Sequence, residues 1–221
     1  MEETKKLSCI DCNVKKCNVK QNIENNKPYP GFCVSHNMDL KDRQRALDTY
    51  LGDEKDLKIM RASAEIEHDF YCQATRVEET IRWAKKLGVK KIGIASCVGL
   101  LKESHLLAGL LREYGFEVYG VGCKIGEVPK TEVGIPERCE EVGVHMCNPI
   151  LQAQMLNKEK TDINIVMGLC VGHDSMFYKY AEGLTTTLVV KDRVLGHNPV
   201  AALYTLDSYY KKLHHLNLEE E

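Results

Sequence analysis

Hydrophobic positions follow a helical period in the first part of this chain. Between residues 38 and 87 they form two amphipathic stripes, separated by the polar stretch LGDEKD. The members of the two stripes are Leu40, Leu47, Tyr50 and Leu51, then Ile66, Phe70, Ala74, Val77, Ile81 and Ala84. Asp53 suits the cap of the second helix. The pattern predicts a helical segment over 38–87 that packs on the core.

From residue 88 onward, short apolar runs alternate with amphipathic stretches. The runs KKIGIAS, FEVYGVG, INIVMGL and TTTLVVK predict strands, while KESHLLAGLLREYG, NPILQAQMLN and DSMFYKYAEG predict helices, and a closing helix begins near Pro199. Such alternation implies right-handed crossovers and a parallel sheet with helices on both faces. We therefore expect an α/β fold, a Rossmann-like three-layer domain over 88–221. There is neither a GxGxxG fingerprint nor a P-loop, so nothing supports nucleotide binding.

Composition narrows the class of protein. The chain has 221 residues, 43% of them hydrophobic, which is enough for one substantial core. Its net charge is −2, with Lys and Arg scattered, so we expect neither a nucleic-acid nor a membrane-surface partner. The beginning, MEETKKL, is polar and lacks a following apolar stretch, so no signal peptide is expected, and no run is long enough for a membrane span. These features predict a cytoplasmic location.

Ten cysteines change this picture, because in a reducing compartment they are more often metal ligands or reactive thiols than disulfides. Four of them fall within residues 1–37, a segment too poor in large apolar residues to build a core alone: Cys9, Cys12, Cys17 and Cys33. The Cys-x2-Cys spacing lets two thiolates clasp one metal, as in zinc and iron–sulfur sites. We expect metal at this set, either Zn²⁺ or a cluster, and the spacing does not choose between them.

Three further cysteines each end a predicted strand: Cys97, Cys123 and Cys170. The carboxyl ends of parallel strands form the crevice where ligands bind. A fourth, Cys147, directly precedes a helix with Asn148 as its cap and Pro149 at its first position, where the helix dipole favours a thiolate. We therefore predict that these four cysteines bind one iron–sulfur cluster, of the four-iron [4Fe–4S] type.

The stretch GLCVGHDSMF also fits a nucleophile elbow, because Gly168-x-Cys170-x-Gly172 has small residues on both sides of the thiol. Two observations weigh against a cysteine hydrolase. Ala95-x-Cys97-x-Gly99 has the same shape, and His173 follows Cys170 too closely to act as its base. The metal centre is the better interpretation, with Gly172 making the turn.

Several other polar residues have two possible roles. Lys124, His173 and His197 could protonate or orient a small substrate beside the cluster. His197 occupies in GHNPV the place of Cys147 in MCNPI, with Asn198 and Pro199 starting a helix, but it could equally be a partly buried histidine bonded to backbone. Ordinary roles are expected for the rest. Asp174 or Ser175 would cap a helix, Cys72 would pack on a helix, and Cys139 would be an exposed thiol.

Five long motifs resemble a known family: KKIGIASCVGLLKES, GVGCKIGEVPK, MCNPILQAQMLN, NIVMGLCVGHDSMF and VVKDRVLGHNPVAALY. The chain is similar to a family of uncharacterised, predicted metal-binding proteins of anaerobic bacteria and archaea. The resemblance covers nearly the whole chain, including the amino-terminal Cys-x2-Cys segment. It implies a metal-binding role without an established reaction, and places the family's motif cysteines on Cys97, Cys123, Cys147 and Cys170.

Three functions remain open at this point. The first is an iron–sulfur protein with two four-cysteine sites, acting in electron transfer with a redox partner, or in redox or sulfur chemistry on a small substrate. The second is a zinc-stabilised enzyme with Cys170 or Cys97 as nucleophile in acyl or sulfur transfer. The third is a metal-stabilised binding module without catalysis. A homo-oligomer is compatible with each. We expect three parts, a cysteine-rich segment 1–37, a helical segment 38–87 and the α/β domain 88–221.

Overall fold

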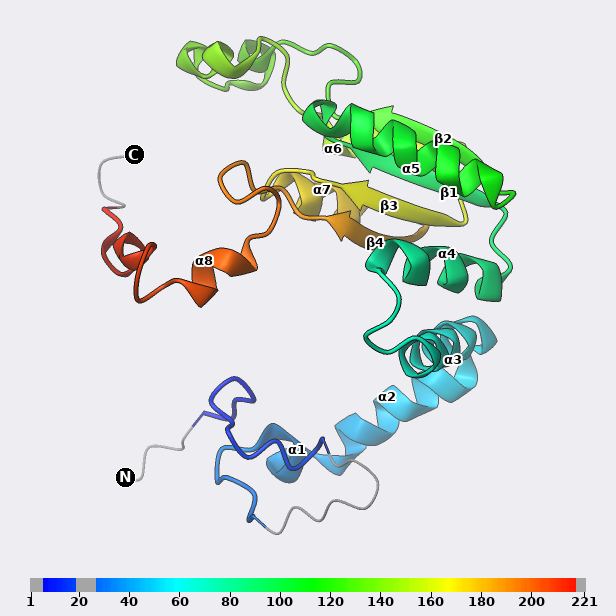
Figure 1. Ribbon diagram of the computed structural model, residues 1–221, viewed down its shortest axis with the longest axis vertical. Helices are drawn as coiled ribbons and strands as arrows, with labels where there is room; N and C mark the ends of the chain where they lie inside the picture. Colours follow the sequence, from blue (N-terminus) through cyan, green and yellow to red (C-terminus); the bar gives the residue numbers. More distant parts are fainter. Residues whose placement is uncertain (1–5, 19–26, 218–221) are drawn as a thin grey trace. The chain divides into compact units, whose positions relative to one another are not determined.

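The computed structural model describes residues 6–18 and 27–217 (Figure 1). Contacts divide the chain into two compact units, Met1–Arg61 and Ala62–Glu221. The division falls within helix α3, Glu54–Asp69. Each unit is described by itself below.

The first unit contains α1 (Val34–Asn37), α2 (Leu40–Gly52) and the beginning of α3. Side-chain caps begin the two longer helices. Asp39 accepts a hydrogen bond from the Lys41 N–H, and Asp53 accepts one from Lys55 at 2.7 Å, which confirms the predicted cap. Among the described residues of this unit none is buried. The described part of this unit therefore forms no hydrophobic core of its own.

The second unit is built on a four-stranded sheet: β1 (Lys91–Ser96), β2 (Glu117–Gly122), β3 (Ile163–Met167) and β4 (Leu184–Val189). All pairings are parallel and the order is β2-β1-β3-β4. The chain leaves β1 toward one side of the sheet and returns to β3 on the other. The carboxyl ends of β1 and β3 therefore flank a topological switch point, where open α/β sheets bind ligands.

Helices cover both faces of this sheet (Figure 1). On one face, α4 (Arg76–Leu87) and α5 (Leu101–Glu113) pack against alternate strand residues such as Ile94 and Ile165. On the other, α6 (Pro149–Lys158) and α7 (His173–Tyr180) pack against Ala95 and Val166. Alternate side chains of a strand point to opposite faces, which builds two apolar layers from one strand. The predicted three-layer α/β fold is confirmed.

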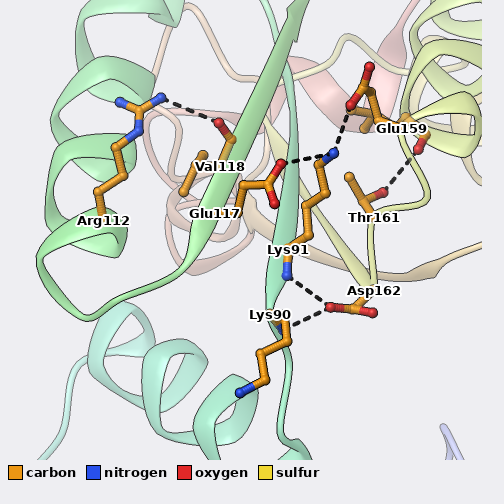
Figure 2. Close-up of polar contacts among 9 residues, drawn as sticks. Lys90, Lys91, Arg112, Glu117, Val118, Glu159, Thr161 and Asp162 are labelled. Atoms are coloured by element: carbon orange, nitrogen blue, oxygen red, sulfur yellow. Dashed lines mark hydrogen bonds and ion pairs between the residues drawn. The ribbon is translucent and has the colours of Figure 1, made fainter.

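Charged side chains hold together the amino-terminal ends of the strands (Figure 2). Lys91 forms ion pairs with Glu117 at 3.0 Å and with Glu159 at 2.7 Å. The Asp162 carboxylate accepts hydrogen bonds from the backbone N–H groups of Lys90 and Lys91, both at 2.8 Å. These contacts stabilise the amino-terminal ends of the strands, and the thiols lie at the opposite, carboxyl-terminal ends.

The remaining segments are irregular. Short 3₁₀ helices cover Val98–Leu100, Lys130–Val133, Glu137–Val142 and Lys211–His215, and α8 spans Val200–Tyr204. In the part of the chain that the structure describes, no helix is long and apolar enough to cross a membrane.

Several local predictions were wrong. Helix α7 begins at His173, because Gly172, with φ +82°, turns the chain into the helix before Asp174 or Ser175 can cap it. The predicted turn at Gly172 is confirmed. Cys72 lies in an exposed turn with φ +56°, since α3 ends at Asp69.

The last helix also begins differently from the prediction. Pro199 itself occupies the cap position of α8, and no described side chain caps that helix. Proline already has a helical φ of −61° there, so Asn198 is displaced from the capping role that Asn148 fills in α6.

Candidate functional site

Three thiols meet at the carboxyl ends of the strands. Cys97 follows β1 and is buried, and Cys123 follows β2 and is only 2% exposed. Cys147, just before α6, places its Sγ 3.8 Å from the Sγ of Cys123. The backbone N–H of Val98 donates to the Cys123 Sγ at 3.4 Å. Residues 50 positions apart in the sequence thus share one small site.

Helix α6 holds these strand ends in place. Its cap, Asn148, accepts a hydrogen bond from Leu151 N–H at 3.0 Å, and its own N–H donates to the Cys123 carbonyl at 2.7 Å. Gln152 is fully buried and donates to the carbonyls of Ser96 at 3.1 Å and Val121 at 2.8 Å. The Gln152 side-chain amide therefore links the carboxyl-terminal ends of β1 and β2, directly before Cys97 and close to Cys123. Rigid support of this kind fixes where thiols point.

The three thiols influence each other's protonation. A hydrogen bond with Cys123 lowers the pKa of Cys97, and the Gly99 backbone and Lys191 lower it further. The same neighbour, followed by a hydrogen bond with His173, lowers the pKa of Cys147. The pKa of Cys123 is raised, because it lies between Cys147 and Cys97. The arrangement favours two thiolates around one protonated thiol, and thiolate is the form that binds metal.

His173 lies beside this group at the beginning of α7. A hydrogen bond with Cys147 raises the pKa of its imidazole. Its Nδ1 is shielded from solvent and has no partner among the described residues. A second cation, Lys124, donates from Nζ to the His145 carbonyl, and its charge also helps to lower the pKa of Cys147. Two of the three predicted polar candidates thus lie next to the thiols.

Cys170, the fourth predicted thiol, has a different partner. Its Sγ accepts a hydrogen bond from the Arg193 guanidinium at 3.0 Å. This contact raises the pKa of Arg193, with smaller contributions from the charges of Cys97 and Cys147. Arg193 therefore lies within electrostatic reach of three of the four cysteines.

The loop after β4 supplies two cations that the sequence reasoning did not single out, Lys191 and Arg193. Lys191 extends toward Cys97: a Cβ added at Gly99 would lie 3.8 Å from both the Lys191 Nζ and the Cys97 Sγ. One added at Gly168 would lie 3.7 Å from the Lys191 Cε. A usable signal was present, because KDR lies at the end of a predicted strand, as Cys97, Cys123 and Cys170 do.

His197 closes this same loop. Its Nδ1 accepts a hydrogen bond from the Asp192 N–H at 3.1 Å, and its own N–H donates to the Asp192 carbonyl at 2.8 Å. This is the partly buried histidine bonded to backbone, one of the two roles considered above. By shaping residues 192–197 it positions Arg193.

The amino-terminal cysteines are less enclosed. Cys9 and Cys17 are exposed, and Cys12 and Cys33 are partly exposed. The Cys12 N–H donates to the Cys9 carbonyl in a tight turn, and Ser8 N–H donates to the Phe32 carbonyl, next to Cys33. Nowhere within residues 6–18 and 27–217 do three or more His, Cys, Asp or Glu side chains stand close enough to hold one metal ion.

Fold and site together define a three-layer α/β protein with a group of thiols at its strand ends. A family model described as "Protein of unknown function (DUF1847)" matches residues 33–188, and the chain belongs to this family. It is also similar to the uncharacterized protein MJ0455 of Methanocaldococcus jannaschii, with 41% identity over 207 residues that cover 94% of this chain and 98% of the relative. The family match includes all four strand-end cysteines and leaves Cys9, Cys12, Cys17, Lys191 and Arg193 outside.

Proposed function

We propose that this chain is a cysteine-ligated iron–sulfur protein. A four-iron cluster would be held at the strand-end crevice by Cys97, Cys123, Cys147 and Cys170. A second centre, a cluster or Zn²⁺, would be held by Cys9, Cys12, Cys17 and Cys33. One observation carries the proposal: four cysteines from four separate loops follow strands or precede a helix at the same end of one sheet, at its switch point.

Electrostatics supports a cluster at the strand-end thiols. The lowered pKa values of Cys97 and Cys147 favour the thiolates that iron requires, while Lys191, Arg193 and Lys124 supply compensating positive charge.

A bound cluster would supply one-electron chemistry. The protein's own contribution would be positional. His173 holds a proton beside Cys147, and Arg193 hydrogen-bonds Cys170. Four bound thiolates favour electron transfer to a redox partner, whereas release of Cys170 would open a position for a small substrate and for redox or sulfur chemistry.

Metal and acid-labile sulfide analysis on protein purified without oxygen tests this proposal. We expect about eight irons and eight sulfides if both sets hold four-iron clusters, or about four of each plus one zinc if only the crevice does. Cys123→Ala should remove one chromophore and leave the other metal in place. Cys139→Ala is the matched control, because Cys139 lies in a 3₁₀ helix outside the group. Zinc alone in colourless protein would refute the cluster.

The contact between Cys147 and His173 favours a second candidate, a zinc-stabilised cysteine enzyme in acyl or sulfur transfer. A thiol with a lowered pKa beside an imidazole with a raised one is the arrangement of an activated nucleophile. For this candidate function, the geometry therefore favours Cys147 as the nucleophile over Cys170 or Cys97. The 3.8 Å between the Cys123 and Cys147 sulfurs also matches two thiolates on one tetrahedral zinc, for which Zn–S bonds of about 2.3 Å give about 3.8 Å.

Alkylation of the metal-loaded protein separates the two candidates. In the enzyme, iodoacetamide should modify Cys147 much faster than the other thiols, and His173→Ala should remove that advantage. In the iron–sulfur protein, all four crevice cysteines should be protected together, because metal occupies each sulfur. Peptide mass spectrometry reads both outcomes.

A further inference from the structure

A cavity of about 340 Å³ lies on elements that carry none of the strand-end thiols. It is bordered by α3, α4 and β4, and its lining residues are Ser63, Ile66, Glu67, Arg76, Glu79, Thr80, Trp83 and Thr186. This volume is at the lower end of ligand-binding pockets, which span about 300–1,000 Å³. It suits a small metabolite.

Contacts between α3 and α4 keep this cavity formed. Ile66 of α3 is 6% exposed and lines the cavity. Glu65 of α3 forms an ion pair with Lys86 of α4, which joins the two helices that border the cavity.

The cavity has charged groups that the protein leaves without partners. Within the described part of the chain, no ion pair or side-chain hydrogen bond engages the carboxylates of Glu67 and Glu79.

Arg76 adds donors to the same cavity. Its Nε donates to the Thr187 carbonyl at 2.9 Å and one terminal nitrogen donates to the Thr186 hydroxyl at 3.2 Å. A guanidinium has five N–H donors, so others stay available, and no acid pairs with Arg76 among the described residues. Arg76, Glu79 and Trp83 recur at i, i+3 and i+7, on one face of α4.

A neighbouring cavity of about 520 Å³ differs from this one in the pairing of its charged groups. It shares Ile66, but the charged groups that line it already have partners: Arg82 lies on Phe70, Lys86 pairs with Glu65, and Glu78 closes the capping box with Thr75. Only the smaller of the two combines unpaired carboxylates with free guanidinium donors. Its chemistry is complementary to a molecule that carries both charges.

We propose that this cavity binds a small zwitterion of the amino-acid type, whose ammonium group donates to Glu67 and Glu79 and whose carboxylate accepts from Arg76. Ile66 and the indole ring provide an apolar wall for its side chain. Since the cavity lies outside the thiol crevice, this site does not depend on the metal proposal.

Trp83 is the single tryptophan of the chain, so its fluorescence reports directly on the cavity. The full-length protein is titrated with each standard L-amino acid, and then with the N-acetyl and the amide derivative of any that binds. We expect a saturable emission change with at least one free amino acid. Each derivative should bind at least tenfold more weakly, because each lacks one of the two charges. An unchanged emission with every amino acid, or equal binding of the derivatives, would overturn the proposal.

Paired variants assign the contacts. Glu79→Gln and Arg76→Gln should each weaken binding about tenfold or more, since each removes one charge-assisted hydrogen bond. Arg82→Gln is the matched control on the same helix: it should leave the affinity unchanged, because Arg82 does not line this cavity. Circular dichroism checks that each variant is folded. Equal affinities in folded Glu79→Gln, Arg76→Gln and native protein would place any bound amino acid elsewhere.

Discussion

At the scale of single residues, Cys147 and His173 are the pair whose chemistry is most sharply defined. Hydrogen bonds with Cys123 and then with His173 lower the pKa of Cys147, so its thiolate persists at pH values where an ordinary thiol, with a pKa of about 8.5, is protonated. In metal-free protein, alkylation of Cys147 should therefore decline only when the pH falls well below neutrality.

His173→Ala should move that alkylation profile to higher pH, because the imidazolium partner of the thiolate is lost. The measurement is the rate of iodoacetamide labelling of the Cys147 peptide against pH, by mass spectrometry. The urea-unfolded protein serves as the reference, since there the thiol has no neighbours. Coincident profiles for the native, variant and unfolded proteins would contradict the pairing.

Substitution by alanine should have opposite effects on stability at Gly168 and at Gly109. A Cβ at Gly168 would lie 2.2 Å from the buried Leu100 Cδ1, and φ is +66° there. We expect Gly168→Ala to lower the free energy of unfolding by about 2–4 kcal/mol. Gly109 lies within α5 with nothing near its missing Cβ, so Gly109→Ala should raise stability by about 0.5–1 kcal/mol. Urea denaturation monitored by circular dichroism compares the two.

At the scale of elements, the carboxylate of Asp162 links β3 to β1 where both begin. It accepts from two backbone N–H groups, that of Lys90, which directly precedes β1, and that of Lys91, the first residue of the strand (Figure 2). Asp162→Ala should reduce the free energy of unfolding by about 1–2 kcal/mol, since two donors lose a charged acceptor. Asp162→Asn keeps an acceptor oxygen and should lose less. Equal urea midpoints for the two variants would show that the hydrogen bonds contribute little.

Both outer strands of the sheet are partly covered by an arginine from a helix on the same face. Arg112 of α5 donates to the Val118 carbonyl on β2, and Arg76 of α4 donates to the Thr187 carbonyl on β4. Free edge carbonyls invite pairing with another chain, and a charged side chain discourages it. The strand order that makes β2 and β4 the edges is a property of the sheet, so this protective role appears only at the level of elements.

At the scale of the whole molecule, the two units obtain stability from different sources. The core consists entirely of residues from Ala62 onward, whereas the described residues of Met1–Arg61 include no buried side chain. A segment without a core needs another source of order, which metal binding supplies in small domains. The absence of a core therefore agrees with the proposed four-cysteine site near the amino terminus.

This difference predicts two separable transitions. Cys12→Ser, or a strong chelator, should remove the amino-terminal metal and part of the helical signal, while the thermal transition of the α/β unit stays in place. Calorimetry and metal analysis on the same samples measure both effects. A single transition that shifts as a whole would mean that the two units unfold together.

Much of this fold follows from local patterns in the sequence. The strand and helix positions from residue 88 onward were predicted within a few residues, because the period of the apolar positions changes visibly between strands and helices. The caps at Asp53 and Asn148 also follow from residue type. The exceptions lie where one residue overrides the usual signal, as Gly172 does by beginning α7 early.

One rule predicts part of the candidate site: polar or thiol residues at the carboxyl ends of parallel strands tend to line a binding site. This rule selects Cys97, Cys123 and Cys170 and would have selected Lys191 as well. The pairing of Cys147 with His173 and of Cys170 with Arg193 depends on which loops face one another, which the order of strands decides.

The sequence by itself therefore determined the class of fold, the parallel character of the sheet and the cysteines worth testing, because periodicity and residue type act over a few neighbouring positions. The tertiary structure alone decided the strand order, the partners of each thiol and the cavity beside Trp83. Those features arise from contacts between residues tens of positions apart, such as Gln152 bridging the ends of β1 and β2. No local pattern encodes a contact of that kind, since it exists only after the layers have packed.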